Sequence, residues 1–298
     1  MNSPDVSGRK ARLYTALLLL AATTAFAGET VDERQPATAR GTVEVSNVAG
    51  TITVRGTSRE EVHVTGELGS KARLEFSVEG ARTIVKVVLP KSSNSGSTDL
   101  DVEVPNGSDL TVSGVSIDID VTDVHGRLDL QTISGEVQAE GFDRDVRINT
   151  VSGDINLRGN KGSAVANIAS TSGNIEIKNM GGDANATSVS GDLNLRLTSV
   201  GRSRLRTTSG TITLYGELTK DARVDSETVS GDINFYLGGS RDGDYEIATA
   251  VGEISNCFGP EPTSHRYGPG EELKFSQGST SASLRAKTLS GDISLCKE

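Results

Sequence analysis

The chain has 298 residues, a formal net charge of −10, 34 glycines, no tryptophan and only 4% aromatic residues. The acidic excess argues against nucleic acid as a partner, because binding a phosphate backbone requires a basic surface. The scarcity of large apolar side chains argues against a thick globular core and favours a thin one built of Ile, Val, Leu, Ala and Thr.

Residues 1–27 have the pattern of an export signal. Arg9, Lys10 and Arg12 precede an apolar stretch over residues 13–25, and Ala25-Phe26-Ala27 places small residues at the cleavage positions. We expect cleavage after Ala27 and a mature protein in the periplasm or outside the cell. The apolar stretch is too short for a membrane span, and no later stretch is long and apolar enough to be one.

Residues 28–110 predict β-strands that lack the regular period of the rest of the chain. The segments TVEVSNV from Thr42 and TITVRG from Thr51 alternate apolar and polar residues, and Gly and Ser separate such segments. We interpret the region as an N-terminal β cap, because the first layer of a stack would otherwise expose an unpaired strand edge.

The following region repeats one motif, Thr/Ser-x-Ser-Gly followed by an acidic or amide residue and Ile-x-Leu, with small variations. Its eight glycines are Gly135, Gly153, Gly173, Gly191, Gly210, Gly231, Gly252 and Gly291, and the first seven are 18 to 21 residues apart. A fixed period near twenty is typical of solenoids. We predict an all-β fold, a single-stranded β-solenoid (β-helix) of about eight rungs over residues 111–298, in which Ser-Gly is a corner between two short strands.

The interval between Gly252 and Gly291 is about two periods long. Residues 258–272 contain three of the seven prolines, and proline is excluded from central strands, so we expect an excursion loop within one enlarged rung. The only two cysteines, Cys257 and Cys296, each lie five residues after a corner glycine. Adjacent rungs would bring them within disulfide distance, so we predict a disulfide that clamps the last rung.

The repeat motif, the export signal and the strand TITVRG together resemble a bacterial β-strand-repeat family of unknown function whose members are named as adhesins. The resemblance covers roughly residues 42–298. It implies a β-solenoid in the cell envelope with a surface-binding role, and it brings no assigned functional residues.

The position after the corner glycine is mostly acidic or amide. Two interpretations are open: a ladder of calcium ligands, or side chains that bond the backbone of the turns. Like charges one layer apart repel, and no calcium-binding repeat is present, so we favour turn chemistry and predict no metal. The column is Glu136, Asp154, Asn174, Asp192, Thr211, Asp232, Glu253 and Asp292.

Strand parity places basic, aromatic and amide side chains together on the outward face after the corner. Such a surface could bind an acidic envelope glycan or another surface ligand, with amides bonding hydroxyls, Tyr rings stacking on sugars, and Arg and Lys pairing carboxylates or phosphates. The alternative is a solvated strand face without a ligand. The candidate binding residues are Asn156, Arg158, Lys178, Asn194, Arg196, Tyr215, Asn234 and Tyr236.

The sequence favours a non-enzymatic protein, either an adhesin-like binding protein or an envelope scaffold, with no cofactor. The histidines His63, His125 and His265 are dispersed, and no nucleophile or phosphate-binding motif is present. One alternative is a carbohydrate-active β-helix enzyme that uses outward carboxylates such as Asp225, Glu227 and Glu246. Another is a structural element that associates end to end, because the rung before the chain end has no obvious cap.

Overall fold

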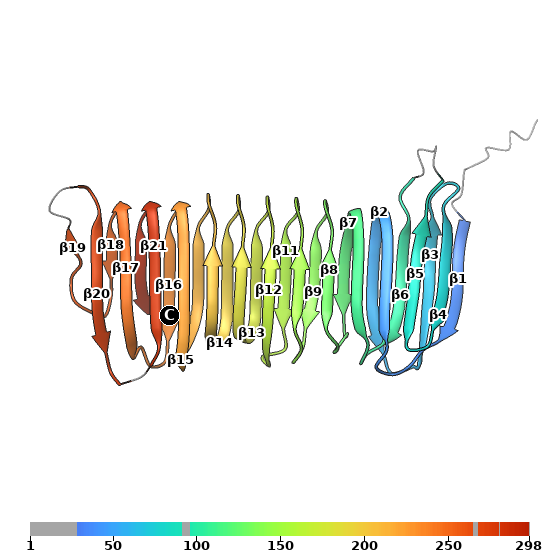
Figure 1. Ribbon diagram of the computed structural model, residues 1–298, viewed down its shortest axis with the longest axis horizontal. Coiled ribbons are helices and arrows are strands. Elements are labelled where there is room, and N and C mark those ends of the chain that lie inside the picture. Colours follow the sequence, from blue (N-terminus) through green and yellow to red (C-terminus); the bar gives the residue numbers. More distant parts are fainter. Residues whose placement is uncertain (1–28, 91–95, 265–267, 280, 298) are drawn as a thin grey trace, which may run out of the picture.

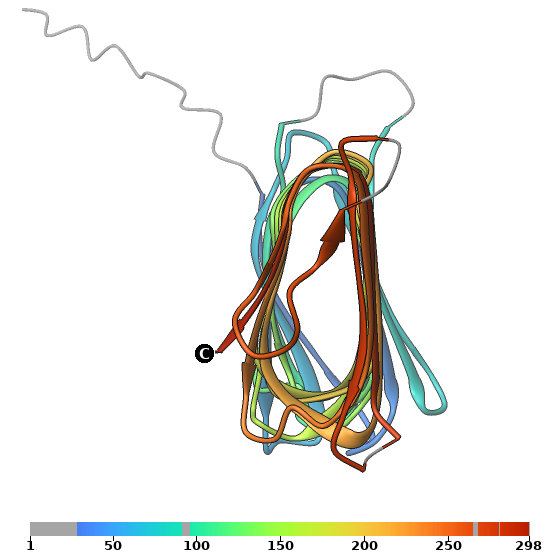
Figure 2. The ribbon, with the colours of Figure 1, turned by 90° about the vertical axis from the view of Figure 1, so that its left-hand side faces the viewer.

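The computed structural model describes residues 29–90, 96–264, 268–279 and 281–297, so the expected export signal and its cleavage site lie outside the described residues. The fold is all-β, and the described ranges contain no helix. None of these residues therefore forms a helix able to cross a membrane. Figure 1 shows an elongated stack of strands, and Figure 2, along its long axis, shows the layers superimposed around a narrow ring.

The described residues form twenty-two strands, which belong to one hydrogen-bonded sheet. They are β1 (Glu29–Pro36), β2 (Thr42–Thr57), β3 (Glu61–Leu68), β4 (Arg73–Glu79), β5 (Arg82–Val88), β6 (Asp99–Pro105), β7 (Asp109–Thr122), β8 (Leu128–Gln131), β9 (Val137–Gly141), β10 (Val146–Asn149), β11 (Ile155–Gly159), β12 (Ser163–Ala169), β13 (Ile175–Thr187), β14 (Leu193–Arg206), β15 (Ile212–Ser230), β16 (Ile233–Gly238), β17 (Gly243–Val251), β18 (Ile254–Asn256), β19 (Thr263–Ser264), β20 (Glu271–Gln277), β21 (Ser283–Ser290) and β22 (Ile293–Lys297).

The repeat motif forms the corner of each layer, as predicted. Successive corners stack in register through parallel bridges between their serines, from Ser116 to Ser230. The strand before a corner and the strand after it pair in parallel with their equivalents one layer away; Ile155, for example, lies opposite Val137 and Ile175. Since alternate residues point inward, these three side chains are fully buried and form part of one continuous apolar core.

The corner glycines permit this stacking. At Gly173 the backbone φ is +156°, and a Cβ atom at this position would lie 2.1 Å from the carbonyl oxygen of Gly153. The backbones of adjacent corners are therefore in direct contact, and any side chain would separate them.

Inward hydroxyl groups complete the corners. The side chains of Ser188, Thr207 and Thr249 are buried, and each donates a hydrogen bond to the carbonyl of a corner glycine in the adjacent layer. The second motif residue instead points outward. In most layers it is a large apolar residue, which is 38–59% exposed at Val48, Val115, Ile133, Val151, Val189, Val229 and Leu289.

The N-terminal region differs from the predicted cap, because parallel stacking already begins at Thr42. Residues 42–55 of β2 pair in parallel with β7, and the other edge of β2 pairs in parallel with β5 and β6. The layers therefore extend well before the boundary expected at residue 110. Antiparallel strands cover this end: β4 pairs with β5, and β3 pairs with β6 and β1.

The C-terminal end corrects the prediction of one enlarged rung. Strands β21 and β22 lie between the layer of β15 and β16 and the layer of β17 and β18, so the last layer in the sequence is not the last in the stack. Strand β20 then pairs antiparallel with β17 on its outer side. The fold is thus not a simple solenoid, since stacking order and chain order diverge at both ends.

The rung that ends the chain lies inside the stack, so it is not the uncovered edge that the hypothesis of end-to-end association assumed. At the outermost layer β20 covers β17, and the Tyr245 ring stacks on Phe275 at 4.6 Å and meets Phe258 edge-on at 5.8 Å. Among the described residues, only Glu271 and Glu272 of β20 pair with a further strand, so end-to-end association stays a prediction. Part of the expected excursion loop, residues 265–267, lies outside the described residues.

Candidate functional site

The eight candidate binding residues lie on one face, formed by the strands that follow the corners. We call it the post-corner face. Register pairs Arg158 with Lys178, Lys178 with Arg196, Arg196 with Tyr215 and Tyr215 with Tyr236. These five side chains form a row across five consecutive layers. The candidate amides Asn156, Asn194 and Asn234 lie two residues earlier on their strands and belong to a second, parallel row.

The two tyrosines of the row turn ring faces toward their neighbours along the stack. Their rings stack on each other with centroids 4.6 Å apart and planes inclined by 11°. The Arg196 guanidinium covers the other face of Tyr215 at 4.1 Å from the ring centroid. Because the ring faces point along the stack, the outer surface carries ring edges and hydroxyl groups, which suit hydrogen bonding better than stacking on a sugar.

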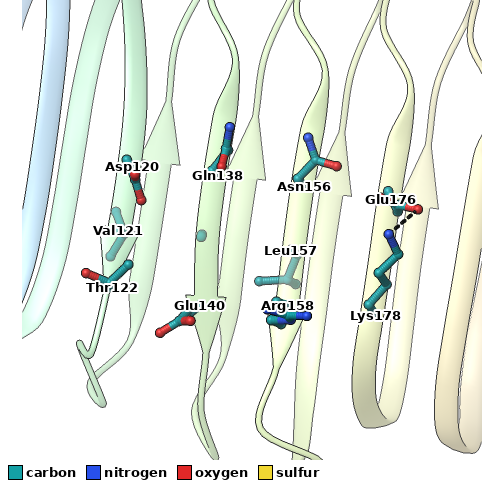
Figure 3. Close-up of a pocket in the computed structure, with 11 residues that line it drawn as sticks. Asp120, Val121, Thr122, Gln138, Glu140, Asn156, Leu157, Arg158, Glu176 and Lys178 are labelled. Atoms are coloured by element: carbon teal, nitrogen blue, oxygen red, sulfur yellow. Dashed lines mark ion pairs between the residues drawn. The ribbon is translucent and has the colours of Figure 1, made fainter.

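The post-corner face is hollowed beside the row, over β7, β9, β11 and β13. The hollow has a volume of about 340 Å³ and is lined by Asp120, Val121, Thr122, Gln138, Ala139, Glu140, Asn156, Leu157, Arg158, Glu176 and Lys178. Figure 3 shows the polar side chains in two rows on successive strands, with Lys178 turned toward Glu176. That ion pair measures 2.8 Å.

Sequence reasoning missed part of this hollow. Asp120, Gln138 and Glu140 occupy the outward positions of earlier layers, in register with Asn156 and Arg158. The available signal was strand parity, which extends the two rows toward the N-terminus once β7 is recognised as a layer of the stack. The small side chain of Ala139 in the floor could not be identified as part of a hollow from the repeat alone.

The acidic column beside the corners is engaged in turn chemistry, which supports the interpretation favoured from the sequence. The Asp192 carboxylate accepts a hydrogen bond from the backbone N–H of Thr211 at 2.7 Å, and Asp292 accepts one from Glu253 at 2.9 Å. Asn174 acts in the same way toward the backbone of Asp192. Over the described ranges, no three His, Cys, Asp or Glu side chains are grouped to hold a metal ion.

The structure contains the disulfide between Cys257 and Cys296, with Cα atoms 4.9 Å apart. Cys257 directly follows β18 and Cys296 lies within β22, and these strands pair in register, so the two residues belong to adjacent layers. Cys296 also lies opposite Tyr236, which places the disulfide at the end of the post-corner row.

Two of the three histidines have structural partners. The His63 Nε2 atom lies 2.7 Å from an Asp32 carboxylate oxygen, and its Nδ1 atom lies 3.3 Å from Glu103. The His125 ring packs on Phe142 with centroids 4.0 Å apart. His265 lies outside the described residues.

Comparison with known proteins places the chain in a family. Among curated proteins, none matches the sequence. A solved structure from Parabacteroides distasonis, described as a "putative lipid binding protein", is 12% identical, covers 90% of this chain and 97% of its own, and has a TM-score of 0.48. A "putative adhesin" from Bacteroides fragilis is also 12% identical, covers 89% and 96%, and has a TM-score of 0.39. The sequence model of Toastrack DUF4097 matches residues 33–296, and the chain belongs to this family.

Proposed function

We propose that the protein is a non-enzymatic, adhesin-like protein of the cell envelope, an exported β-solenoid rod whose post-corner face binds an envelope glycan. The observation that carries this proposal is the row of hydrogen-bonding side chains beside the hollow of about 340 Å³, held on rigid parallel strands. Repeat proteins bind through extended surfaces of this kind. The disulfide supports an oxidising compartment outside the cytoplasm.

The charges of the hollow favour a neutral glycan over an acidic one. Lys178 is paired with Glu176, and the remaining charged side chains are the acids Asp120 and Glu140 and the base Arg158. An acidic sugar would meet more negative than positive charge. Carboxylate and amide groups instead form hydrogen bonds with the hydroxyl groups of an uncharged sugar.

Carboxylates named for the enzyme alternative are engaged with arginines. The Asp225 carboxylate lies 3.5 Å from Arg206 and 3.7 Å from Arg204. Hydrogen bonding and the charge of Arg285 lower the pKa of Glu246. A glycosidase general acid requires a raised pKa, so Glu246 is in the wrong state for that role at neutral pH.

The test uses the mature chain, residues 28–298, and envelope polysaccharide separated by anion exchange into neutral and acidic pools. We expect retention on the neutral pool, and loss of retention in the variant Asn156→Ala/Arg158→Ala. A matched control, Asn167→Ala/Arg147→Ala, removes the same residue types from exposed positions on the opposite face and keeps retention. Equal loss in both variants, or release of reducing ends from the polysaccharide, would contradict the proposal.

A further inference from the structure

The face opposite the candidate site contains a larger depression, which the sequence analysis did not consider. A groove of about 1060 Å³ lies over the strand segments that precede the corners in β12 to β15, β21 and β17. It extends onto β20, the antiparallel strand beside β17. We call it the arginine groove. It crosses several layers, so an extended ligand could lie along the axis of the stack.

Strand parity concentrates arginine in this groove. Arg202 and Arg204 occupy alternate positions of β14 and therefore point to the same side, and both line the groove. The next layer contributes Arg223 opposite Arg202, and β21 contributes Arg285 opposite Asp225. The groove lining contains one more basic than acidic residue, although the whole chain has a net charge of −10.

The basic side chains of the groove are more exposed to solvent than their acidic partners. The Arg202 side chain is 76% exposed and its partner Asp183 is 21% exposed. The same relation holds for Arg285 and Glu246, which are 58% and 34% exposed. An approaching ligand therefore meets guanidinium groups first, with the carboxylates beneath them.

Those carboxylates also fix the arginines in place. The Asp183 carboxylate accepts a hydrogen bond from Arg202 Nε at 3.0 Å and lies 2.9 Å from Arg202 Nη2. In the same way, the Glu246 carboxylate accepts a hydrogen bond from Arg285 Nε at 3.0 Å and lies 2.9 Å from Arg285 Nη2. A guanidinium held at one edge keeps its remaining N–H groups directed outward, which reduces the entropy lost on binding an anion.

Two further basic residues of the lining, Arg223 and Lys274, form no direct ion pair with a carboxylate of the described residues. Lys274 lies opposite Glu246 in the pairing of β17 with β20, and its charge contributes to the lowered pKa of Glu246. Neither side chain has to break a direct ion pair before it binds a ligand, whereas the arginines around them are held in a fixed orientation.

The remaining lining suits a sugar chain better than a nucleic acid. Asn185, Ser276 and Ser283 offer groups that hydrogen-bond to hydroxyls. Single-stranded nucleic acid is bound by exposed aromatic rings, but the Tyr245 ring is buried against Phe275. The overall negative charge also disfavours a dense polyphosphate.

We propose that the arginine groove binds an acidic polysaccharide, with its carboxylate or phosphate groups paired to the outward guanidinium groups. This site is independent of the neutral-glycan site on the post-corner face. A rod with both sites would connect a neutral glycan on one side to an acidic glycan on the other.

The test measures binding of the mature chain to polygalacturonate and to dextran carrying phosphate esters, with plain dextran and double-stranded DNA as comparisons. We expect binding to one or both anionic glycans that weakens as salt is added, and none to dextran in this groove. The two anionic polymers distinguish carboxylate from phosphate recognition.

The test variant is Arg204→Gln/Arg223→Gln/Lys274→Gln, which leaves Asp225 paired with Arg206 and should keep the fold. We expect affinity to fall at least about tenfold. The control Arg127→Gln/Arg144→Gln/Arg147→Gln removes the same charge from exposed positions outside the groove and should bind as the unmodified protein does.

Equal loss in the two variants would show a response to net charge alone and overturn the proposal, as would tighter binding to DNA or no binding to either anionic glycan. The neutral-pool assay with Asn156→Ala/Arg158→Ala has a separate outcome, so failure of one site leaves the other unaffected.

Discussion

Replacement of a corner glycine by alanine tests whether contact between backbones holds the layers together. In Gly173→Ala the new Cβ atom would lie 2.1 Å from the carbonyl oxygen of Gly153 and 2.7 Å from its carbonyl carbon. Both distances are far below van der Waals contact, and the obstructing atoms are backbone. The layers must therefore separate or the corner must change its conformation.

The cost has two parts. A non-glycine residue at φ +156° is strained by about 1–3 kcal/mol. Relief of the overlap with Gly153 adds about 1–3 kcal/mol, the usual cost of inserting atoms into a closely packed site. We therefore expect the free energy of unfolding to fall by about 2–6 kcal/mol.

The control is Gly268→Ala. Gly268 has a similar φ of +141°, but no atom of the described residues, apart from its chain neighbours, lies within 4 Å of its Cβ position. It should lose only the conformational part, about 1–3 kcal/mol. Urea unfolding followed by circular dichroism gives both free energies. If Gly173→Ala is no less stable than Gly268→Ala, the close approach of adjacent corners does not limit the choice of residue.

Three further changes test other parts of the structure. Asp192→Ala removes the acceptor for the Thr211 backbone N–H and should cost about 1 kcal/mol, measured by urea unfolding, whereas Asp192→Asn should cost less; equal costs would exclude the hydrogen bond as the cause. Replacement of Cys257 and Cys296 by serine opens a loop of 39 residues and should lower the unfolding free energy by about 4 kcal/mol. Reduction of the disulfide in the unmodified protein should give the same change. An unfolding free energy that does not change on adding reductant would contradict this prediction. Burial raises the pKa of Tyr245 to about 12, so the folded state keeps a proton that the unfolded state loses above pH of about 10. The free energy of unfolding should therefore fall as the pH rises between these values, and it should fall less steeply in Tyr245→Phe. Identical slopes of unfolding free energy against pH in the two proteins would refute the assignment.

The repeated motif predicts the layers because one period carries three local constraints. The glycine sets the corner, the preceding Thr or Ser supplies an inward hydroxyl, and alternation after the corner separates buried Ile155 and Leu157 from outward Asn156 and Arg158. These constraints depend on neighbouring residues, so they can be identified without tertiary information. The cysteine pairing followed from the same equivalence of positions.

The order of the end layers could not be predicted in this way. Every copy of the motif presents similar parallel edges, so the sequence contains no local signal that β21 pairs with both β15 and β17. The corner at Gly50 was also missed, because Asn47-Val48-Ala49-Gly50 lacks the serine of the motif. The Tyr215–Tyr236 stack depends on side-chain conformations across layers, which strand parity does not specify. The arginine groove depends on the order of the end layers, because residues of β21, β17 and β20 line it.

The insertion of β21 and β22 between earlier layers has a consequence for biosynthesis. At about 5–20 residues per second, the ribosome releases β15 to β18 before the strands that separate their two layers. Until residues 283–297 have emerged, β16 and β18 lack their shared neighbour β22, and Cys257 lacks its partner. This part of the stack therefore cannot be completed until those residues have emerged, and a product truncated before Ser283 would retain two unpaired parallel edges that are prone to aggregation.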